Sequence, residues 1–245
     1  MKVIFLSKKS FTNLAIGLLC LLTVVYLAGN WWQQSTTVTA DKRIPIYQGS
    51  SEKKQVSLAI NIDWGEEYLP DMLNILESNQ VKATFFITGR WAQKFPEITR
   101  SIAQKGHEIG NHGFSHASPN KMSLEQNKSE ITRTMSVIEK ATGKRTRLFA
   151  PPSGERADHV LQAAAELGHS TILWSVDTID WERPSPDVII NRVFKKVHNG
   201  AIILMHPTNS TLEALPEIIR ELKNREYILV TVSENVFTSV AEEDG

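Results

Sequence analysis

The chain has 245 residues, of which 41% are hydrophobic, so it can hold one large α/β domain or two small ones with a sizeable core. Its 27 basic residues balance 27 acidic ones, which argues against a nucleic-acid-binding surface, because such a surface needs an excess of Lys and Arg. The single cysteine, Cys20, excludes any disulfide within the chain.

An apolar run near the N-terminus predicts a membrane-spanning helix. Residues 14–32 carry no charge, and a run of this length approaches the roughly 20 residues that cross a bilayer as a helix. Lys8 and Lys9 before it favour a cytoplasmic N-terminus, which would leave the rest of the chain outside the cell. The alternative is a signal peptide that is cleaved near Ala40 to release a secreted protein. We favour the uncleaved form, a single-pass anchor over residues 1–32 in the cell membrane.

Residues 33–54 are polar and predict a tether, with a short strand at 44–47.

From residue 55 to about 240, β-rich runs alternate with helical patterns. Strands are expected at 56–62, 83–87, 108–110, 146–149, 170–176, 201–205 and 227–232, and helices at 69–79, 91–105, 123–142, 157–167, 186–196 and 211–224. This alternation predicts βαβ units around a parallel sheet, and the number of units favours a barrel over an open sheet.

Histidines and carboxylates recur directly after these strands, where a parallel barrel collects its functional side chains. His112 and His116 are spaced so that both imidazoles can face one point, as metal ligands do, although a bare His-x-x-x-His is a weak signal. Each residue also has an ordinary structural explanation, such as helix capping for Asp63 or burial for His206. Their joint recurrence makes a shared site the better interpretation, with these members: Asp63, His112, His116, Asp180 and His206.

Several motifs, taken in order, resemble the polysaccharide deacetylase family (carbohydrate esterase family 4, NodB-homology domain) over about residues 55–235. They are Ala83–Gly89, Gly106–His112, Pro151-Pro152-x-Gly154, Asp177-x-x-Asp180-Trp181 and Leu204-Met205-His206. The resemblance implies a distorted (β/α) barrel that removes N-acetyl groups from peptidoglycan or chitin-like glycans. It also implies a divalent metal, zinc or cobalt, held by an Asp-His-His set. The run Trp64–Glu67 is similar to a sporulation-linked subgroup.

Three positions depart from the family pattern, and one of them is Ser153, where the family usually has Tyr after Pro-Pro. The first family motif, Thr-Phe-Asp-Asp-Gly, corresponds to Asn61–Gly65, so the base position is Asp63 while the metal carboxylate position is Trp64. The arginine expected before Pro-Pro is Ala150. A two-histidine site should hold zinc weakly, and Asp63 without a cation should have a raised pKa. Rescue is expected from ligation by Asp63 itself, from Glu66 or Glu67 as ligand, or from Arg147 or Arg156 as cation.

The resemblance suggests a mechanism if the chain is active. A metal at His112 and His116 would activate water, Asp63 would accept its proton, and His206, oriented by Asp180, would protonate the leaving amine. The remaining histidines are interpreted as structural. Substrate contacts are expected from Trp181, Pro152, Ser153 and Trp64.

Two main function classes follow, and an altered, metal-independent activity on an unnamed substrate is a third option. The first is a membrane-tethered N-deacetylase of cell-wall glycan, and the second is a catalytically impaired protein that binds glycan on the same fold. Trp64 and Ala150 favour the second, whereas the retained aspartates and histidines favour the first. A monomer whose partners are the membrane and the glycan, with no nucleic acid, fits both.

Overall fold

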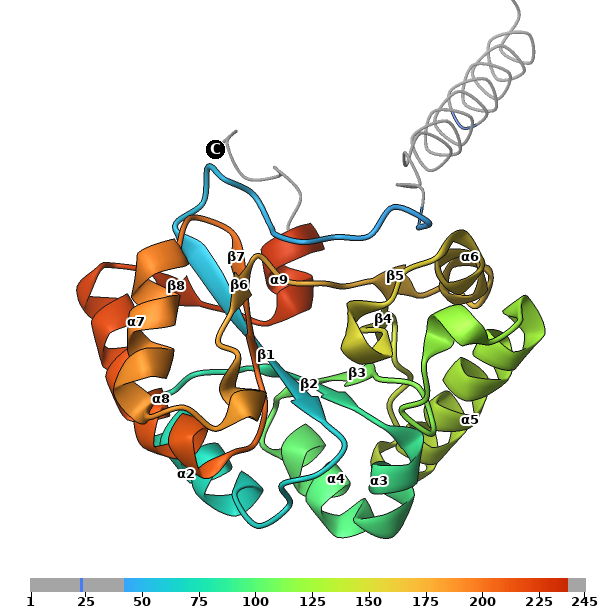
Figure 1. Ribbon diagram of the computed structural model, residues 1–245, viewed down its shortest axis with the longest axis horizontal. Coiled ribbons are helices and arrows are strands. Elements are labelled where there is room, and N and C mark those ends of the chain that lie inside the picture. The colour runs from blue at the N-terminus through green and yellow to red at the C-terminus, as the bar shows by residue number, and fades with distance from the viewer. Residues whose placement is uncertain (1–22, 24–41, 238–245) are drawn as a thin grey trace, which may run out of the picture. The chain divides into compact units, whose positions relative to one another are not determined.

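The computed structural model describes Thr23 and residues 42–237 (Figure 1). Within this part, strands β1 to β8 form one parallel sheet in the order β5-β4-β3-β2-β1-β7-β6, with β8 also paired to β1. No ladder joins β5 to β6 among the described residues. The sheet is therefore a barrel left open on one side, which agrees with the distorted (β/α) barrel expected from the sequence.

The strands are β1 (Gln55–Ile62), β2 (Thr84–Ile87), β3 (Glu108–Asn111), β4 (Leu148–Phe149), β5 (Ser170–Thr171), β6 (Val176–Asp177), β7 (Ala201–Met205) and β8 (Ile228–Leu229). The α-helices are α2 (Leu69–Ser78), α3 (Gly89–Lys94), α4 (Pro96–Gln104), α5 (Leu124–Thr142), α6 (Asp158–Glu166), α7 (Pro186–Lys196), α8 (Asn209–Asn224) and α9 (Val232–Phe237). Short 3₁₀ turns are η1 (Pro119–Lys121), η2 (Pro152–Gly154) and η3 (Asp180–Glu182).

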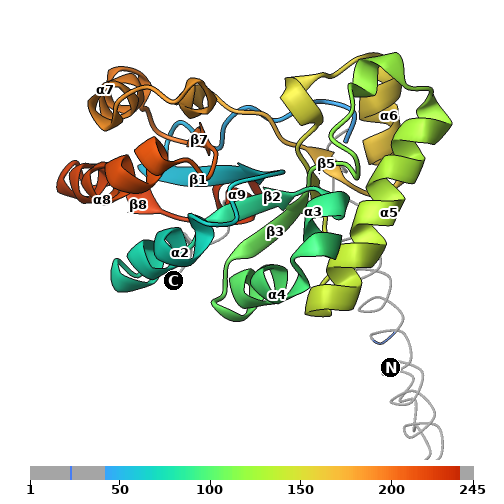
Figure 2. The ribbon, with the colours of Figure 1, turned by 60° about the horizontal axis from the view of Figure 1, so that its bottom comes forward.

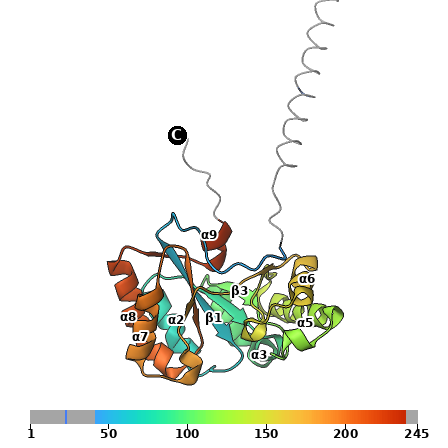
Figure 3. The same cartoon turned by 45° about the horizontal axis from the view of Figure 1, so that its top comes forward.

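The central strand β1 separates two apolar cores. Because side chains alternate along a strand, Val56, Leu58 and Ile60 face the helices and join the larger core. Ala59 points the other way, into the barrel, with Phe86. The helices cover the outside of the sheet, with α7 and α8 at one side and α5 and α6 at the other (Figures 2 and 3). This arrangement brings the carboxyl ends of the strands to one mouth.

Most predicted elements are present, although the strands expected at 146–149 and 227–232 are shorter, and α9 begins where the second of these was expected to end. Two further differences have clear reasons. The strand at 201–205 and the helix at 186–196 are confirmed at the same bounds. The helix expected at 91–105 is broken into α3 and α4, because the ring of Pro96 disfavours helical backbone at Phe95. The strand expected at 170–176 is two short strands, because the backbone of Leu173 donates a hydrogen bond to Ile46 instead of continuing along the sheet.

The described half of the expected tether is attached to the barrel. Ile46 forms a parallel bridge with Ile172, and Gln48 forms an antiparallel bridge with Ala201. The Gly49 N–H donates to the Gly200 carbonyl at 2.8 Å. The expected membrane segment lies outside the described residues except for Thr23. Within the described residues, no helix has the length and apolarity to cross a bilayer.

A buried histidine gives this fold a testable dependence on pH. His107 is 2% exposed, its Nδ1 accepts a hydrogen bond from the Ala83 N–H, and its ring meets the Phe85 ring edge-on. Burial lowers the pKa of His107 from 6.5 to about 4, with help from nearby Lys82 and Lys105. The unfolded chain therefore binds the proton more readily, and the free energy of unfolding should fall as the pH drops from about 6.5 to about 4.

We expect His107→Asn to reduce this acid dependence, because an amide oxygen can still accept from Ala83 but does not titrate. The slope of unfolding free energy against pH should decrease by up to about 1.4 kcal/mol per pH unit, the value for one proton. Urea titrations at several pH values between 7 and 4 measure it for both proteins. Equal slopes would contradict the assignment of His107.

Candidate functional site

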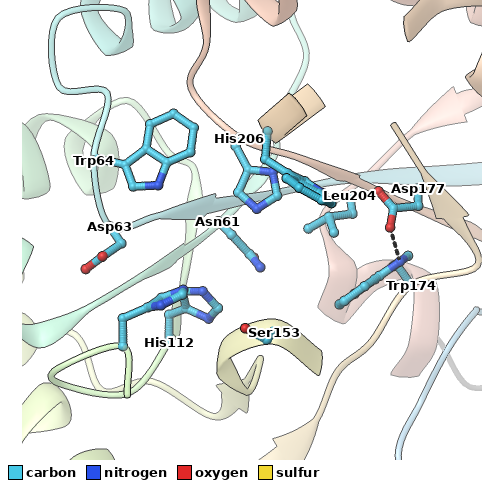
Figure 4. A pocket seen from close by; sticks show the side chains of 11 residues that line it. Asn61, Asp63, Trp64, His112, Ser153, Trp174, Asp177, Leu204 and His206 are labelled. Carbon is cyan, nitrogen blue, oxygen red and sulfur yellow. Dashed lines mark hydrogen bonds between the residues drawn. The ribbon is translucent and has the colours of Figure 1, made fainter. Parts of the chain in front are cut away.

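A cavity of about 460 Å³ opens at the carboxyl ends of the strands (Figure 4). It brings together most of the residues predicted for the site, although Pro152 and Asp180 are buried and do not line it. Its walls also include residues that the sequence analysis did not assign to the site: Asn61, Trp174, Asp177 and Leu204. The complete lining is Asn61, Asp63, Trp64, His112, His116, Ser153, Trp174, Asp177, Trp181, Leu204 and His206.

The two histidines of the sequence motif lie together, with ring centroids 5.0 Å apart. His112 is buried, and its Nδ1 lies 2.7 Å from the Ala150 carbonyl oxygen. A carbonyl only accepts, so Nδ1 carries the proton and Nε2 keeps its lone pair. Burial lowers the pKa of His112 to about 3, with a smaller contribution from His116, so the ring is neutral. Neutral imidazole is the form that binds metal.

One carboxylate, on helix α5, holds the loop that carries His116. Glu130 on α5 accepts hydrogen bonds from the N–H groups of Phe114 and Ser115 and from the Ser115 hydroxyl, at 2.7 to 2.9 Å. His116 itself adopts a left-handed backbone conformation, with φ of 55°. Such strain persists only where the surroundings impose it, and Glu130 supplies that constraint.

Asp63 has a cationic partner that the sequence analysis did not identify. Arg90, at the start of α3, donates from Nε at 2.7 Å and from Nη2 to the carboxylate, and Thr88 donates at 2.8 Å. Hydrogen bonding to Asp63 raises the pKa of Arg90. The expectation that Asp63 lacks a cation is therefore wrong, and neither Arg147 nor Arg156 has the role proposed for it. Arg90 follows β2, so the rule that pointed to the other strand ends could have found it.

Asp180 and His206 form the predicted pair. Asp180 is fully buried, and its Oδ1 lies 2.7 Å from Nδ1 of His206. Its Oδ2 accepts from the His206 N–H and from the hydroxyl of Thr211, both at 2.6 Å. The carboxylate thereby fixes both the backbone and the ring of His206, and the Nε2 edge of the ring is left for the cavity.

Trp64 occupies the position of the family's metal carboxylate and packs on the acid–base pair instead. Its ring lies nearly parallel to that of His206, with centroids 6.0 Å apart and an interplanar angle of 10°. An indole has no lone pair to offer a metal. Neither Glu66 nor Glu67 lines the cavity, and both oxygens of Asp63 are engaged by Arg90.

The residues present therefore do not fit the Asp-His-His metal set. Within residues 42–237, no group of three or more His, Cys, Asp or Glu side chains is placed to hold a metal ion. A catalytic zinc site normally has three protein ligands, and this cavity supplies two imidazoles. What the cavity does retain is a charged pair at Asp63, an oriented imidazole at His206, and aromatic walls.

The opposite wall is built from Trp174 and the turn at Ser153. The Trp174 Nε1–H donates to Asp177 at 3.1 Å, and Asp177 also accepts from the Ile179 N–H at 2.8 Å. Trp181, beyond this turn, is 54% exposed, and Trp64 across the cavity is 37% exposed. Exposed indole faces are suited to stacking on the apolar face of a sugar ring.

Comparisons with known proteins match this architecture. The family model for polysaccharide deacetylases matches residues 48–172. The Bacillus subtilis protein YlxY is 45% identical over 78% of this chain, which spans 60% of that relative's length. A peptidoglycan-N-acetylglucosamine deacetylase of Bacillus cereus is 34% identical over 79% of the chain and 72% of the enzyme.

Among solved structures, a carbohydrate esterase family 4 pseudoenzyme from Bacillus anthracis aligns with a TM-score of 0.77 and 44% identity, covering 79% of this chain and 69% of that one. A mutant of the same pseudoenzyme, described as having restored enzymatic activity, aligns with the same TM-score and identity over 79% and 71% of the two chains. Together these matches show that the chain belongs to the polysaccharide deacetylase family.

Proposed function

We propose that this protein binds N-acetylated glycan of the peptidoglycan type in the cavity, and that metal-assisted deacetylation is lost or strongly weakened. The observation that carries the proposal is the position of Trp64, where the ring stacks on His206 and no third ligand from residues 42–237 joins the two histidines. The likeness to a Bacillus anthracis pseudoenzyme supports the loss of activity. The apolar walls support retained binding, because sugar rings stack on exposed indoles.

A slow deacetylase is the second candidate, favoured by one specific observation. The Asp180–His206 pair and the Arg90–Asp63 pair are both complete, although a protein that only binds glycan needs neither. In this alternative Asp63 would accept a proton from water, and His206 would protonate the leaving amine. The deacetylase relatives from Bacillus cereus and Bacillus subtilis act on peptidoglycan sugars, which supports the same class of glycan in both cases.

The experiment measures binding and acetate release on the full chain. We expect it to bind acetylated chitotetraose and isolated peptidoglycan, and to release no more acetate in the presence of zinc than a His206→Ala variant does. Acetate release above that variant would replace the first candidate by the second. Failure to bind either glycan would overturn both.

We also propose that this binding takes place outside the cell, with the barrel tethered to the membrane. The uncharged run at 14–32 after Lys8 and Lys9 supports this. Protease treatment of wall-free protoplasts of a bacterium that expresses the full chain should digest the barrel. Protection from protease would contradict the tethered orientation.

The position of Asn61 leads to a further prediction about how the cavity binds the acetyl group. It lies at the end of β1 among the cavity residues, is 7% exposed, and its Oδ1 is buried with no hydrogen-bond partner in the described part of the chain. Figure 4 shows its amide extending between His206 and Ser153. Beside the apolar Leu204, this amide can pair with the carbonyl or N–H of an acetamido group.

We expect Asn61→Leu to weaken binding of acetylated chitotetraose about tenfold, since one hydrogen bond to a buried amide is lost. The free energy of unfolding should not fall, because leucine is of similar size and removes an unpaired polar atom. Calorimetric titration with the acetylated tetramer and its deacetylated form measures the effect. The role of Asn61 is contradicted if the variant binds the acetylated tetramer as well as the natural chain does.

A further inference from the structure

A second, smaller cavity adjoins the one described above. It has a volume of about 220 Å³ and is lined by Tyr47, Ser153, Gly154, Arg156, Leu173 and Trp174. Ser153 and Trp174 line both cavities, so the two cavities lie on either side of these residues. A ligand that extends across Ser153 and Trp174 can therefore contact both. We refer to the smaller one as the Arg156 cavity.

The shared wall depends on a glycine. Gly154 has a φ of 67°, and a Cβ at this position would lie 2.8 Å from the Trp174 ring. Any other residue would therefore push this ring away from the turn. The preceding Ser153 is also left-handed, with φ of 57°. The turn is thus shaped to let Trp174 stand between the two cavities.

The Arg156 guanidinium brings a positive charge to this cavity. It donates one hydrogen bond, to the Gly154 carbonyl at 3.3 Å, and lies 5.8 Å from the centre of the Tyr47 ring. Among the described residues, no carboxylate lies within ion-pair distance of it. Its remaining N–H groups can therefore bind an anion, and a guanidinium matches the planar shape of a carboxylate. The half-exposed Tyr47 ring offers a face for a sugar.

We propose that the Arg156 cavity is a subsite for a carboxylate-bearing part of the glycan, next to the sugar whose acetyl group enters the larger cavity. This rests on the proposed function, because it assumes that the larger cavity binds an N-acetylated sugar. It also assigns a role to the segment at 42–54, which reaches the barrel through Ile46 and places Tyr47 beside Arg156. Peptidoglycan offers two such carboxylates, the lactyl ether of its muramic acid and the acidic groups of its peptides.

The test compares three tetrasaccharides by calorimetric titration of the full chain. The first, acetylated chitotetraose, has no carboxylate. The second, a peptide-free peptidoglycan tetrasaccharide, exposes the lactyl carboxylate. The third, a peptide-bearing peptidoglycan tetrasaccharide, carries only the carboxylates of its peptides. We expect at least one carboxylate-bearing ligand to bind about tenfold more tightly than chitotetraose. Arg156→Gln should remove this preference and leave chitotetraose binding unchanged. Arg147→Gln, an exposed arginine outside both cavities, is the charge-matched control and should change neither.

The outcomes distinguish failure of the Arg156 subsite from failure of the proposed glycan binding. A higher affinity for the peptide-free ligand identifies the lactyl carboxylate as the group that Arg156 binds. A higher affinity for the peptide-bearing ligand alone identifies a peptide carboxylate. Equal affinity for all three ligands, or equal loss in the Arg156 and Arg147 variants, overturns the subsite while glycan binding stands. If the natural chain binds none of the three, the proposed function itself fails.

Discussion

A Trp64→Asp variant is expected to bind zinc at least about 100-fold more tightly than the natural chain. The two imidazoles are already paired, with His112 neutral and its Nδ1 held by the Ala150 carbonyl. A carboxylate at residue 64 would add the third and only anionic ligand, which completes the number of protein ligands usual in catalytic zinc sites. Loss of the indole costs the stacking on His206, about 0.5–1.5 kcal/mol, in addition to the contacts of the covered part of a side chain that is 37% exposed.

Trp64→Asn is the matched control, because it removes the same indole and leaves a side chain of the same size without the charge. Competition with a chromophoric zinc chelator measures the affinity of each variant. Acetate release from acetylated chitotetraose should rise in Trp64→Asp alone, and a second substitution, His206→Ala, should abolish it. Equal zinc affinities for the Asp and Asn variants would show that the histidine pair is not an incomplete metal site.

The barrel was predictable because its signal is local. Each β-rich run and each helical pattern can be recognised within a short window, and α7 and β7 match their predicted bounds. The break between β5 and β6 was not predictable, since it depends on Ile46, more than 120 residues earlier in the chain, which takes the hydrogen bond of Leu173. Pairing over such a separation leaves no mark on the local pattern.

The site shows the same difference between local sequence signals, which were predictable, and contacts between distant residues, which were not. The rule that functional side chains follow parallel strands placed Asp63, His112 and His206 in one cavity. The rule cannot say which side chain reaches which. Arg90 restores the cation that Ala150 removes, but from a different strand end, and only the fold shows that a guanidinium there meets Asp63. The stacking of Trp64 on His206 is likewise a consequence of three-dimensional arrangement.

Asp180→Ala is expected to lower stability more than substitution of the carboxylates that line the cavity. The carboxylate is fully buried and accepts from the His206 N–H, the His206 ring and the Thr211 hydroxyl. Alanine leaves the His206 N–H and the His206 ring without this partner, and leaves the Thr211 hydroxyl with only the Thr208 hydroxyl among the described residues. This should lower the free energy of unfolding by about 3–5 kcal/mol. Asp177→Ala is the matched control, because that carboxylate is half-buried and, within the described part of the chain, accepts from Trp174 and Ile179 alone. A loss of about 1 kcal/mol is expected.

Asp180→Asn distinguishes orientation of the imidazole from simple packing. An amide oxygen can still accept from the His206 N–H and from Thr211, while the amide nitrogen must donate to Nδ1 of His206. The ring would then carry its proton on Nε2, the reverse of the tautomer that the carboxylate imposes. Urea titration should place this variant between the natural chain and Asp180→Ala, and the nitrogen NMR shifts of the His206 ring should report the exchanged tautomer. An unchanged tautomer, or an Ala variant no less stable than Asp177→Ala, would show that Asp180 does not orient His206.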